Sequence, residues 1–224
     1  MSRIRKYWVV GGTSGIGLAT ADWLARYGQA AFISGREVSV DDTGQLRVFA
    51  EKWGPFDGLV YSAGVHNLQW AEATQPHTMM ALYDVNVVGL LRVLQALDFK
   101  VERTVVVGSD AGWRPMRTSL AYCCSKAALE MAVQVIARER ASDQFAINLV
   151  APGMTQPTDM QEYVDAAVPT LRGWTEAQAA EYEMSMTPLK RRAHVSEVAE
   201  VVGKTLMMET PYLNGATIAV NGAR

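Results

Sequence analysis

Several residue types and patterns that mark particular functional classes are scarce in this chain. Its 224 residues include two cysteines and three histidines, and the formal net charge is only −2. A charge this small gives no electrostatic reason to expect binding to nucleic acid or to an anionic membrane. His66, His77 and His194 show no metal-ligand spacing, so we expect no metal centre.

The sequence also shows no long apolar run and no recognisable targeting signal. No uninterrupted apolar stretch matches a membrane span, and residues 1–6 lead directly into a predicted strand without a signal-peptide core. Cys123 and Cys124 are adjacent, and a disulfide between neighbours on a helix would be strained. We therefore expect two reduced cysteines and a cytoplasmic protein.

The hydrophobic pattern predicts strands that alternate with helices. Predicted strands cover residues 7–10, 30–34, 57–61, 103–108, 146–150 and 217–220, and predicted helices cover 16–27, 78–97, 119–141 and 196–208. This alternation is typical of a parallel sheet covered on both faces. We predict an α/β fold in which residues 1–224 form a single Rossmann-type domain with a doubly wound sheet.

Two regions interrupt the alternation. Residues 36–54 are too few for a complete crossover and are predicted to hold a short strand at 38–41 and a helix at 45–53, so one crossover helix is missing. Residues 154–192 are long and rich in Met, Thr and Pro, and they are predicted to form a helical insertion acting as a substrate lid.

A glycine-rich segment lies between the first predicted strand and the first predicted helix. Its sequence is Gly11-Gly12-Thr13-Ser14-Gly15-Ile16-Gly17. Glycines at such a turn let the backbone approach a pyrophosphate, which binds the N–H groups at the helix N-terminus. The segment predicts a dinucleotide site, although a purely structural turn has the same composition.

The end of the second strand bears on the choice of coenzyme. An acidic residue there would bind a ribose 2′-hydroxyl and favour NAD, but this chain has Gly35-Arg36. A guanidinium suits a 2′-phosphate, so we predict a preference for NADP, with NAD as the open alternative. Arg36 as a solvated surface residue also remains open.

Tyr122 and Lys126 are four residues apart in a predicted helix and so share one face of it. A lysine cation near a phenol favours the phenolate, which predicts a lowered tyrosine pKa and proton exchange near neutral pH. Ser109 lies thirteen residues upstream of the tyrosine. A surface pair is the alternative interpretation of Tyr122 and Lys126.

Taken in order along the chain, these segments resemble the motifs of the short-chain dehydrogenase/reductase family. The resemblance covers nearly the whole length, and the motifs are Val10-Gly11-x-x-x-Gly15-x-Gly17, Tyr61-Ser62-Ala63-Gly64, Asn86, Ser109, Tyr122-x-x-x-Lys126, Pro152-Gly153 and Asn221-Gly222. The family's fold agrees with the predicted alternation. Val10 and Tyr61-Ser62 replace polar residues of the family, and the family's second helix is deleted.

The resemblance implies an NAD(P)-dependent oxidoreductase that transfers hydride between nicotinamide and a carbonyl or secondary alcohol. It implies a catalytic set of Asn86, Ser109, Tyr122 and Lys126, in which Asn86 holds a water of the proton relay and Lys126 also binds the nicotinamide ribose. The implied cofactor-binding residues are Gly11, Thr13, Ser14, Gly15, Ile16, Gly17, Arg36, Asp41, Ser62, Ala63, Gly64, Tyr122, Lys126, Pro152, Gly153 and Thr155.

The family also implies a homo-oligomer, a tetramer or dimer paired through the helices at 78–97 and 119–141. Residues 152–161 show a weaker, local resemblance to 2,3-dihydro-2,3-dihydroxybenzoate dehydrogenases, which also have a shortened second crossover. A dihydrodiol-type dehydrogenase and a non-catalytic dinucleotide sensor are therefore alternatives. An epimerase or dehydratase needs a substrate domain, for which the chain has no room.

The substrate is predicted only as a small carbonyl compound or alcohol. Apolar residues are frequent in the predicted lid, namely Met154, Met160, Tyr163, Trp174, Tyr182, Met184 and Met186. They favour an apolar, cyclic partner, and packing of the lid on itself explains them equally well.

Overall fold

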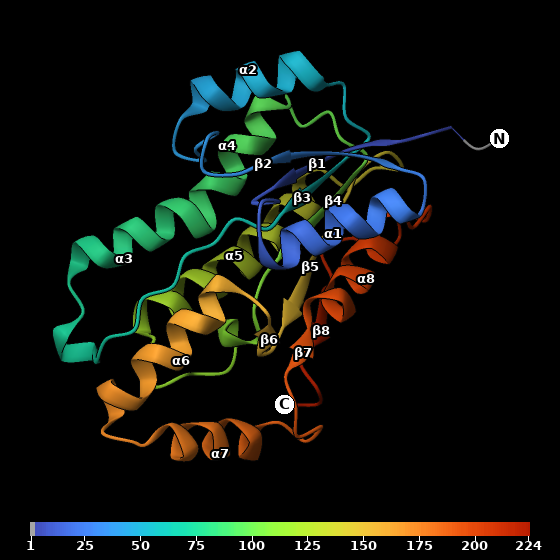
Figure 1. Cartoon of the computed structure of the whole chain (residues 1–224). Helices are drawn as coiled ribbons and strands as arrows, with labels where there is room; N and C mark the ends of the chain where they lie inside the picture. The colour runs from blue at the N-terminus through green and yellow to red at the C-terminus, as the bar shows by residue number, and fades with distance from the viewer. Residues whose placement is uncertain (1–2) are drawn as a thin grey trace.

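A six-stranded parallel sheet organises the computed structural model, which describes residues 3–224 (Figure 1). The sheet has the strand order β2-β1-β3-β4-β5-β8. Its strands are β1 (Lys6–Val10), β2 (Ala30–Ser34), β3 (Gly58–Tyr61), β4 (Arg103–Val107), β5 (Ala146–Pro152) and β8 (Thr217–Val220). A second, two-stranded sheet pairs β6 (Thr155–Gln156) with β7 (Ala193–His194).

Helices cover both faces of this sheet, as predicted (Figure 1). They are α1 (Gly15–Arg26), α2 (Thr43–Trp53), α3 (Pro76–Tyr83), α4 (Gly89–Ala96), α5 (Leu120–Glu139), α6 (Asp159–Arg172), α7 (Glu176–Met186) and α8 (Val195–Leu206), with short helical turns η1 (Ala71–Ala73), η2 (Asp84–Val88) and η3 (Asp110–Gly112). The α/β prediction is confirmed.

The side chains of β1 show how the two layers are built. Tyr7 and Val9 are buried in the cluster that includes residues of α1 and α8, whereas Trp8 and Val10 are buried in the cluster that includes residues of α2, α4 and α5. Successive residues of a strand point to opposite faces, so one apolar strand serves two cores. This explains why the strands are continuous apolar runs rather than alternating ones.

The helix predicted at 78–97 is divided by a π-helical turn. α3 passes into η2 and then into α4 without leaving the helical region of backbone angles. Inside η2, Asn86 is completely buried. Single π turns recur at functional sites because they redirect one side chain out of the regular helical register.

The shortened crossover after β2 differs in part from the prediction. The missing helix is confirmed, since α2 alone connects β2 to β3. The short strand predicted at 38–41 is wrong, because these residues form turns: Val38 N–H donates to the Gly35 carbonyl, and Asp42 N–H donates to the Ser39 carbonyl. Within residues 3–224, β2 pairs only with β1 and forms one edge of the sheet.

Residues 154–192 form two helices at the carboxyl end of the sheet. Figure 1 shows α6 and α7 beyond β6 and β7, on the side to which the strands point. α6 begins at the N-cap Thr158, and α7 begins with a capping box formed by Thr175 and Gln178. The predicted helical insertion is present, and its action as a lid stays a prediction.

Two helical stretches meet a length and hydropathy criterion that the sequence pattern was not expected to meet. Residues 76–96 and Leu120–Glu139 are long and apolar enough to cross a membrane by length and composition. Core helices of soluble proteins pass the same test, and here 33% and 39% of the apolar 18-residue windows in the two stretches are buried in the protein. The free thiols of Cys123 and Cys124 are half-buried on α5, as expected for reduced cysteines.

Candidate functional site

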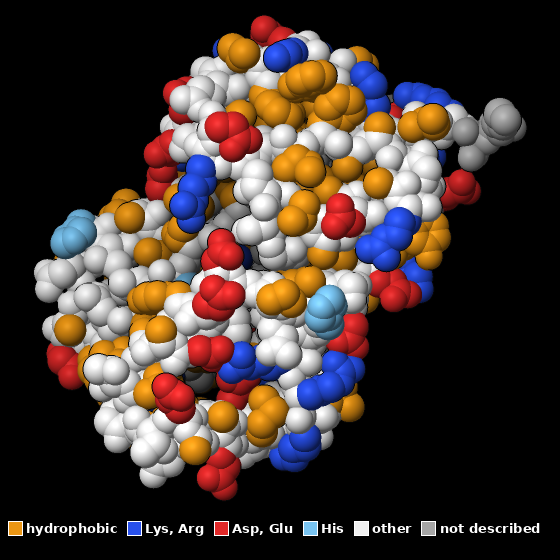
Figure 2. Space-filling model, viewed as in Figure 1, with side chains coloured by type: hydrophobic (Ala, Val, Ile, Leu, Met, Phe, Trp, Pro, Cys, Tyr) orange, Lys and Arg blue, Asp and Glu red, His pale blue; other side chains and the backbone are white. Residues whose placement is uncertain are grey.

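A large cleft opens where the parallel strands end. Its volume is about 1550 Å³, and it extends from the glycine loop before α1 to the helices α6 and α7. Figure 2 shows a hollow on this face with charged side chains of both signs around it. Because the chain leaves β1 toward β2 and returns on the other side through β3, the cleft lies at the topological switch point, where open α/β sheets bind ligands.

The glycine loop has little room for side chains. Gly11 has a φ of +74°, and a Cβ atom on it would lie 2.6 Å from the Ala63 nitrogen. A Cβ atom on Gly17 would lie 2.1 Å from the Gly11 carbonyl oxygen. The N–H groups of Gly11 and Gly12 both donate to the Ser34 carbonyl at the end of β2. Close packing therefore requires glycine at positions 11 and 17.

The N-terminus of α1 is suited to an anion. Its N-cap residue Ser14 makes no side-chain capping hydrogen bond, and the first turn contains no acidic residue. Thr13, Ser14, Gly15 and Ile16 all line the cleft. Unsatisfied N–H groups and the positive end of the helix dipole favour a phosphate at this position. A dinucleotide pyrophosphate therefore fits the residues present.

Arg36 lies at the end of the cleft that is close to β2. Its side chain is exposed, lines the cleft and forms no ion pair with any residue in 3–224. Neither neighbouring aspartate takes it as a partner, since Asp41 accepts a hydrogen bond from Ser39 and Asp42 caps α2. Glu37, the next residue along the chain, accepts the Gly35 N–H at 2.8 Å. Arg36 is therefore free to contact a ligand.

Most of the predicted site residues meet in this cleft. Those that line it are Gly11, Thr13, Ser14, Gly15, Ile16, Arg36, Ser62, Ala63, Gly64, Ser109, Tyr122, Lys126, Pro152, Gly153 and Thr155. The structure does not bring Gly17, Asp41 or Asn86 to the cleft wall. Gly17 is buried beneath the loop, and Asp41 contacts Ser39. The half of the cleft near Arg36 is lined instead by Val38, Ser39 and Val40.

The side chain of Asn86 is occupied by protein partners. Its amide nitrogen donates to the Val65 carbonyl at 3.0 Å and to Ser125 Oγ at 2.9 Å, and its oxygen accepts the Val65 N–H at 2.8 Å. This amide connects η2 to the loop after β3 and to α5. Its role in holding a relay water stays a prediction, and the structure shows that Asn86 orients the cleft wall.

Ser109, Tyr122 and Lys126 converge at the middle of the cleft. Ser109 follows β4, while Tyr122 and Lys126 are one turn apart on α5 and are 6% and 4% exposed. Lys126 Nζ lies 5.7 Å from the centre of the Tyr122 ring and donates to the Val107 carbonyl at 3.2 Å. The arrangement places a phenol, a hydroxyl and an ammonium group around one position.

The predicted lowering of the Tyr122 pKa is wrong. Burial raises the pKa of Tyr122 to about 12, the Ser109 hydroxyl lowers it, and the charge of Asp110 raises it. Burial also lowers the pKa of Lys126 to about 8. Removal from water is thus the largest influence on both groups.

Two further features of the cleft escaped the sequence analysis. The first is His66, whose ring lies edge-on to Tyr122 with a centroid distance of 4.2 Å. Its Nε2 lies 3.3 Å from Ser119 Oγ, and its Nδ1 is buried without a hydrogen-bond partner among residues 3–224. Burial and the Lys126 charge lower its pKa to about 4, so it is neutral near pH 7. Only a tertiary contact reveals it.

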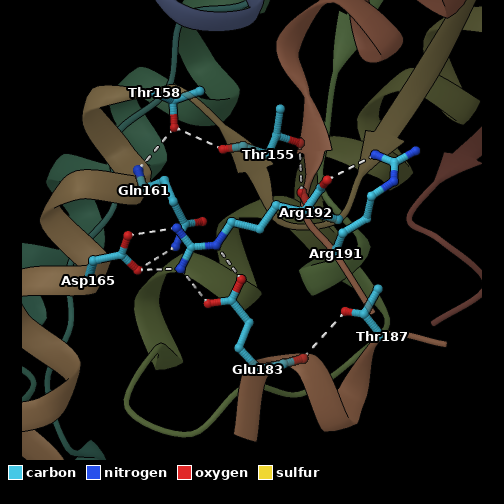
Figure 3. Close-up of polar contacts among 9 residues, drawn as sticks. Thr155, Thr158, Gln161, Asp165, Glu183, Thr187, Arg191 and Arg192 are labelled. Atoms are coloured by element: carbon cyan, nitrogen blue, oxygen red, sulfur yellow. Dashed lines mark hydrogen bonds and ion pairs between the residues drawn. The ribbon is translucent and has the colours of Figure 1, made fainter. Parts of the chain in front are cut away.

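The second feature is an ion-pair network under the two helices of the predicted lid (Figure 3). Arg192 donates to both carboxylate oxygens of Glu183 on α7, at 2.6 and 2.7 Å, and to both oxygens of Asp165 on α6, also at 2.6 and 2.7 Å. Gln161 donates to Asp165 at 2.9 Å. One guanidinium therefore connects both helices to the segment before β7.

Apolar residues of the predicted lid divide into two groups. Met154, Met160, Tyr163, Tyr182 and Met186 line the cleft, whereas Trp174 and Met184 do not. Trp174 packs on Tyr182 with a ring-centroid distance of 5.1 Å. Some of these residues are therefore placed to contact an apolar partner in the cleft, and others pack the segment on itself.

Sequence comparisons point to one family. A family profile described as short chain dehydrogenase matches residues 40–169. The 3-oxoacyl-[acyl-carrier-protein] reductase MabA of Mycobacterium tuberculosis is 29% identical over 238 residues, covering 97% of this chain and 92% of that protein. A diacetyl reductase [(S)-acetoin forming] of Staphylococcus aureus is 28% identical over 183 residues, covering 79% of this chain and 70% of that protein.

Structural comparison gives the same fold. A variant of the actinorhodin polyketide ketoreductase, solved with NADPH, superposes with a TM-score of 0.89 at 22% identity and covers 99% of this chain and 98% of that chain. A short chain dehydrogenase family protein of Francisella tularensis superposes with a TM-score of 0.86 at 23% identity, covering 98% of each chain.

Proposed function

The chain belongs to the short-chain dehydrogenase family, and on this premise we propose that it is an NADP(H)-dependent oxidoreductase that interconverts a carbonyl compound and a secondary alcohol. The observation that carries the proposal is the convergence of Ser109, Tyr122 and Lys126 in the cleft that begins at the glycine loop. Relatives that act on carbonyl groups, the 3-oxoacyl reductase and the diacetyl reductase, support it.

The residues of the cleft have distinct tasks in this reaction. NADPH, when bound, would supply the hydride for the carbonyl carbon. Tyr122 donates its phenolic proton to the carbonyl oxygen, and the Ser109 hydroxyl donates a hydrogen bond to the same oxygen. Lys126 is fixed by its hydrogen bond to the Val107 carbonyl. Its remaining N–H groups would hold the ribose of the coenzyme, and its charge would favour the phenolate left after proton transfer.

Three features of this chain support the coenzyme assignment. The N-terminus of α1 is uncapped and faces the cleft, Gly11 admits a close approach, and Arg36 is exposed without an ion-pair partner among the described residues. An arginine at the end of β2 can bind a 2′-phosphate in two-pronged fashion. The similar ketoreductase was solved with NADPH. NAD is the second candidate, because Glu37 places a carboxylate beside the same strand end.

The central test is carbonyl reduction with NADPH across a panel of ketones, 3-oxoacyl thioesters and secondary alcohols, in wild type and Tyr122→Phe. We expect turnover by the wild type and a loss of at least about a hundredfold in kcat for the variant, since general acid catalysis contributes roughly 10²–10⁴-fold. NADPH affinity should remain nearly unchanged, because the ring still packs beside His66. Activity of the variant within a few-fold of wild type would overturn the role of Tyr122.

Coenzyme preference is tested by kcat/KM for NADPH and NADH in wild type, Arg36→Ala and the control Arg47→Ala. Arg47 is an exposed arginine of α2 away from the cleft. Charge-assisted bonds to a phosphate contribute about 1.5–3 kcal/mol, so Arg36→Ala should lose roughly ten- to a hundredfold preference for NADPH. A wild-type preference for NADH, or the same preference in all three proteins, would remove Arg36 from the site.

The proposal extends to surroundings and assembly. The two half-buried free thiols support a reducing, cytoplasmic location. Exposed apolar side chains on α3, η2, α4 and α5 support a homo-oligomer, namely Met80, Val88, Leu91, Leu120, Met131 and Val135. The substrate remains a small carbonyl compound or alcohol that fits between Tyr122 and the two helices of the predicted lid.

A further inference from the structure

The residue that follows Ser109 is a buried carboxylate. Asp110 is 2% exposed and begins the turn η3 at the cleft. Arg224, which follows β8, reaches into the same place with a side chain that is 5% exposed, and its Nη1 lies 3.7 Å from Asp110 Oδ2. Both residues line the cleft. An ion pair from two segments more than a hundred positions apart is thus buried beside the reacting groups.

The geometry of this pair gives a charge interaction rather than a hydrogen bond. The separation of 3.7 Å is too long for a hydrogen bond, and Asp110 Oδ2 and Arg224 Nε have no hydrogen-bond partner among residues 3–224. Charges interact strongly in a buried setting, and a buried carboxylate without its cation is costly. Arg224 is therefore the cation that forms an ion pair with this buried carboxylate.

Several charged or titratable side chains surround Asp110 and Tyr122. Those acting on Asp110 are Arg224, Arg114 and Asn221. Those acting on Tyr122 are Ser109, Asp110 and Cys123, and His66 and Lys126 contact its ring. Burial raises the pKa of Asp110, whereas Arg224 and Arg114 oppose the rise. Asp110 in turn raises the pKa of both Tyr122 and Cys123. One carboxylate therefore acts on two neighbouring proton donors of α5.

We propose that Arg224 is a positioning residue of the active site, which neutralises the buried Asp110 carboxylate and so prevents that charge from opposing ionisation of Tyr122. The inference rests on the proposed function insofar as Tyr122 transfers the proton. It adds Arg224 and the Asp110 carboxylate to the groups that control this proton transfer.

The half-buried thiol of Cys123 provides a measurement that needs no enzymatic activity. In a Cys124→Ser background, the pH midpoint of Cys123 alkylation by iodoacetamide reports the charge of the pocket. Arg224→Met exposes the thiol to an uncompensated carboxylate and should raise the midpoint by about one pH unit, while Asp110→Asn should lower it by a similar amount. The double variant Asp110→Asn/Arg224→Met should have the wild-type midpoint, because it removes both charges. The charge-conserving Arg224→Lys should also have the wild-type midpoint.

The matching kinetic measurement is the rate of alcohol oxidation at one fixed pH. In this direction Tyr122 must act as a base, so the rate depends on the fraction of phenolate. Arg224→Met should slow oxidation about tenfold, the effect of one pH unit in the tyrosine ionisation, and the double variant should recover most of it. Arg47→Met, a charge loss away from the cleft, should change neither readout.

Opposite shifts by the two single variants would support the proposal. Equal midpoints in all variants, or shifts in one direction only, would overturn it and leave the pair with a purely structural role. Arg224→Lys keeps the test decisive if Arg224→Met does not fold, because a midpoint changed by Arg224→Lys would also contradict charge compensation. If the protein reduces no carbonyl compound, the proposed function fails while the thiol measurement still decides this inference.

Discussion

At the scale of single residues, Lys126 combines a buried position with a charge that depends on pH. Its pKa is lowered to about 8 by burial, so its ammonium form is lost just above neutral pH. We expect Lys126→Ala to lose both turnover and NADPH affinity, and Lys126→Met to do the same while filling the space. Fluorescence titration should show that wild-type affinity for NADPH weakens above about pH 8 and that Lys126→Met has no such dependence.

An effect confined to the pH profile of turnover would contradict this prediction. In that case the ammonium group would assist Tyr122 without contacting the ribose. Measuring affinity in the absence of substrate separates the two tasks of Lys126.

His66 predicts a dependence of stability on acid pH. Its pKa is lowered to about 4 by burial and by the Lys126 charge, against an ordinary value of 6.5. Between these values the unfolded chain binds the proton and the folded chain does not, so stability should decrease as pH falls from 6.5 to 4. Between pH 6.5 and pH 4 the melting temperature of the wild type should therefore fall further than that of His66→Gln, by about 2–4 °C for each kcal/mol of stability lost.

The control for this measurement is His77→Gln, since His77 is exposed on α3. It should leave the acid dependence of the wild type intact. An unchanged dependence in His66→Gln would show that another group takes up the proton.

At the scale of elements, α6 and α7 depend on one guanidinium. Arg192 is 18% exposed, and its hydrogen bonds with Glu183 and Asp165 raise its own pKa. Burial opposes ionisation of Asp165, but the bonds from Arg192 and Gln161 outweigh it and hold the pKa of Asp165 low. Arg192→Gln should leave Glu183 as an unpaired buried charge and destabilise this segment by about 3 kcal/mol.

Limited proteolysis of residues 157–190 and the KM for the carbonyl substrate measure this effect. We expect faster cleavage and an increased KM in Arg192→Gln. The neighbouring Arg191→Gln is a matched control, because Arg191 is more exposed and pairs with Glu197 on α8. Equal cleavage of the two variants would show that the network does not hold the helices.

The elements also show how far the sequence alone could lead. Continuous apolar runs and glycine turns located every strand of the main sheet, because both faces of that sheet are buried. The π turn at Asn86 and the turns at 38–41 were not predictable, since they depend on contacts with Val65, Ser125 and α2 rather than on local pattern. Ser109, Tyr122 and Lys126 were found through motif spacing, whereas His66, Arg192 and Arg224 become visible only when distant segments meet.

At the scale of the whole molecule, two adjacent helical segments carry apolar side chains that remain exposed. Leu91 on α4 and Met131 on α5 are 41% and 58% exposed. Apolar side chains on neighbouring helices are typical of an interface between two copies related by a two-fold axis. We predict a tetramer or dimer by light scattering at micromolar concentration.

Substitutions of exposed apolar residues on α4 and α5 test whether these helices form the predicted interface between copies. Leu91→Glu and Met131→Glu should reduce the measured mass, because each introduces a charge into an apolar contact. Val48→Glu is the control, since Val48 is 63% exposed on α2, outside these helices. A monomeric wild type would refute the assembly.

The shortened crossover has a consequence for the behaviour of the chain in solution. Since no further strand follows β2 in the described sheet, one side of β2 presents backbone N–H and C=O groups without ladder partners. Its five residues are uncharged, and Ile33 is 37% exposed. Such an edge is a template for adding a strand from another chain. When the protein is heated or concentrated, β2 is therefore where aggregation should begin.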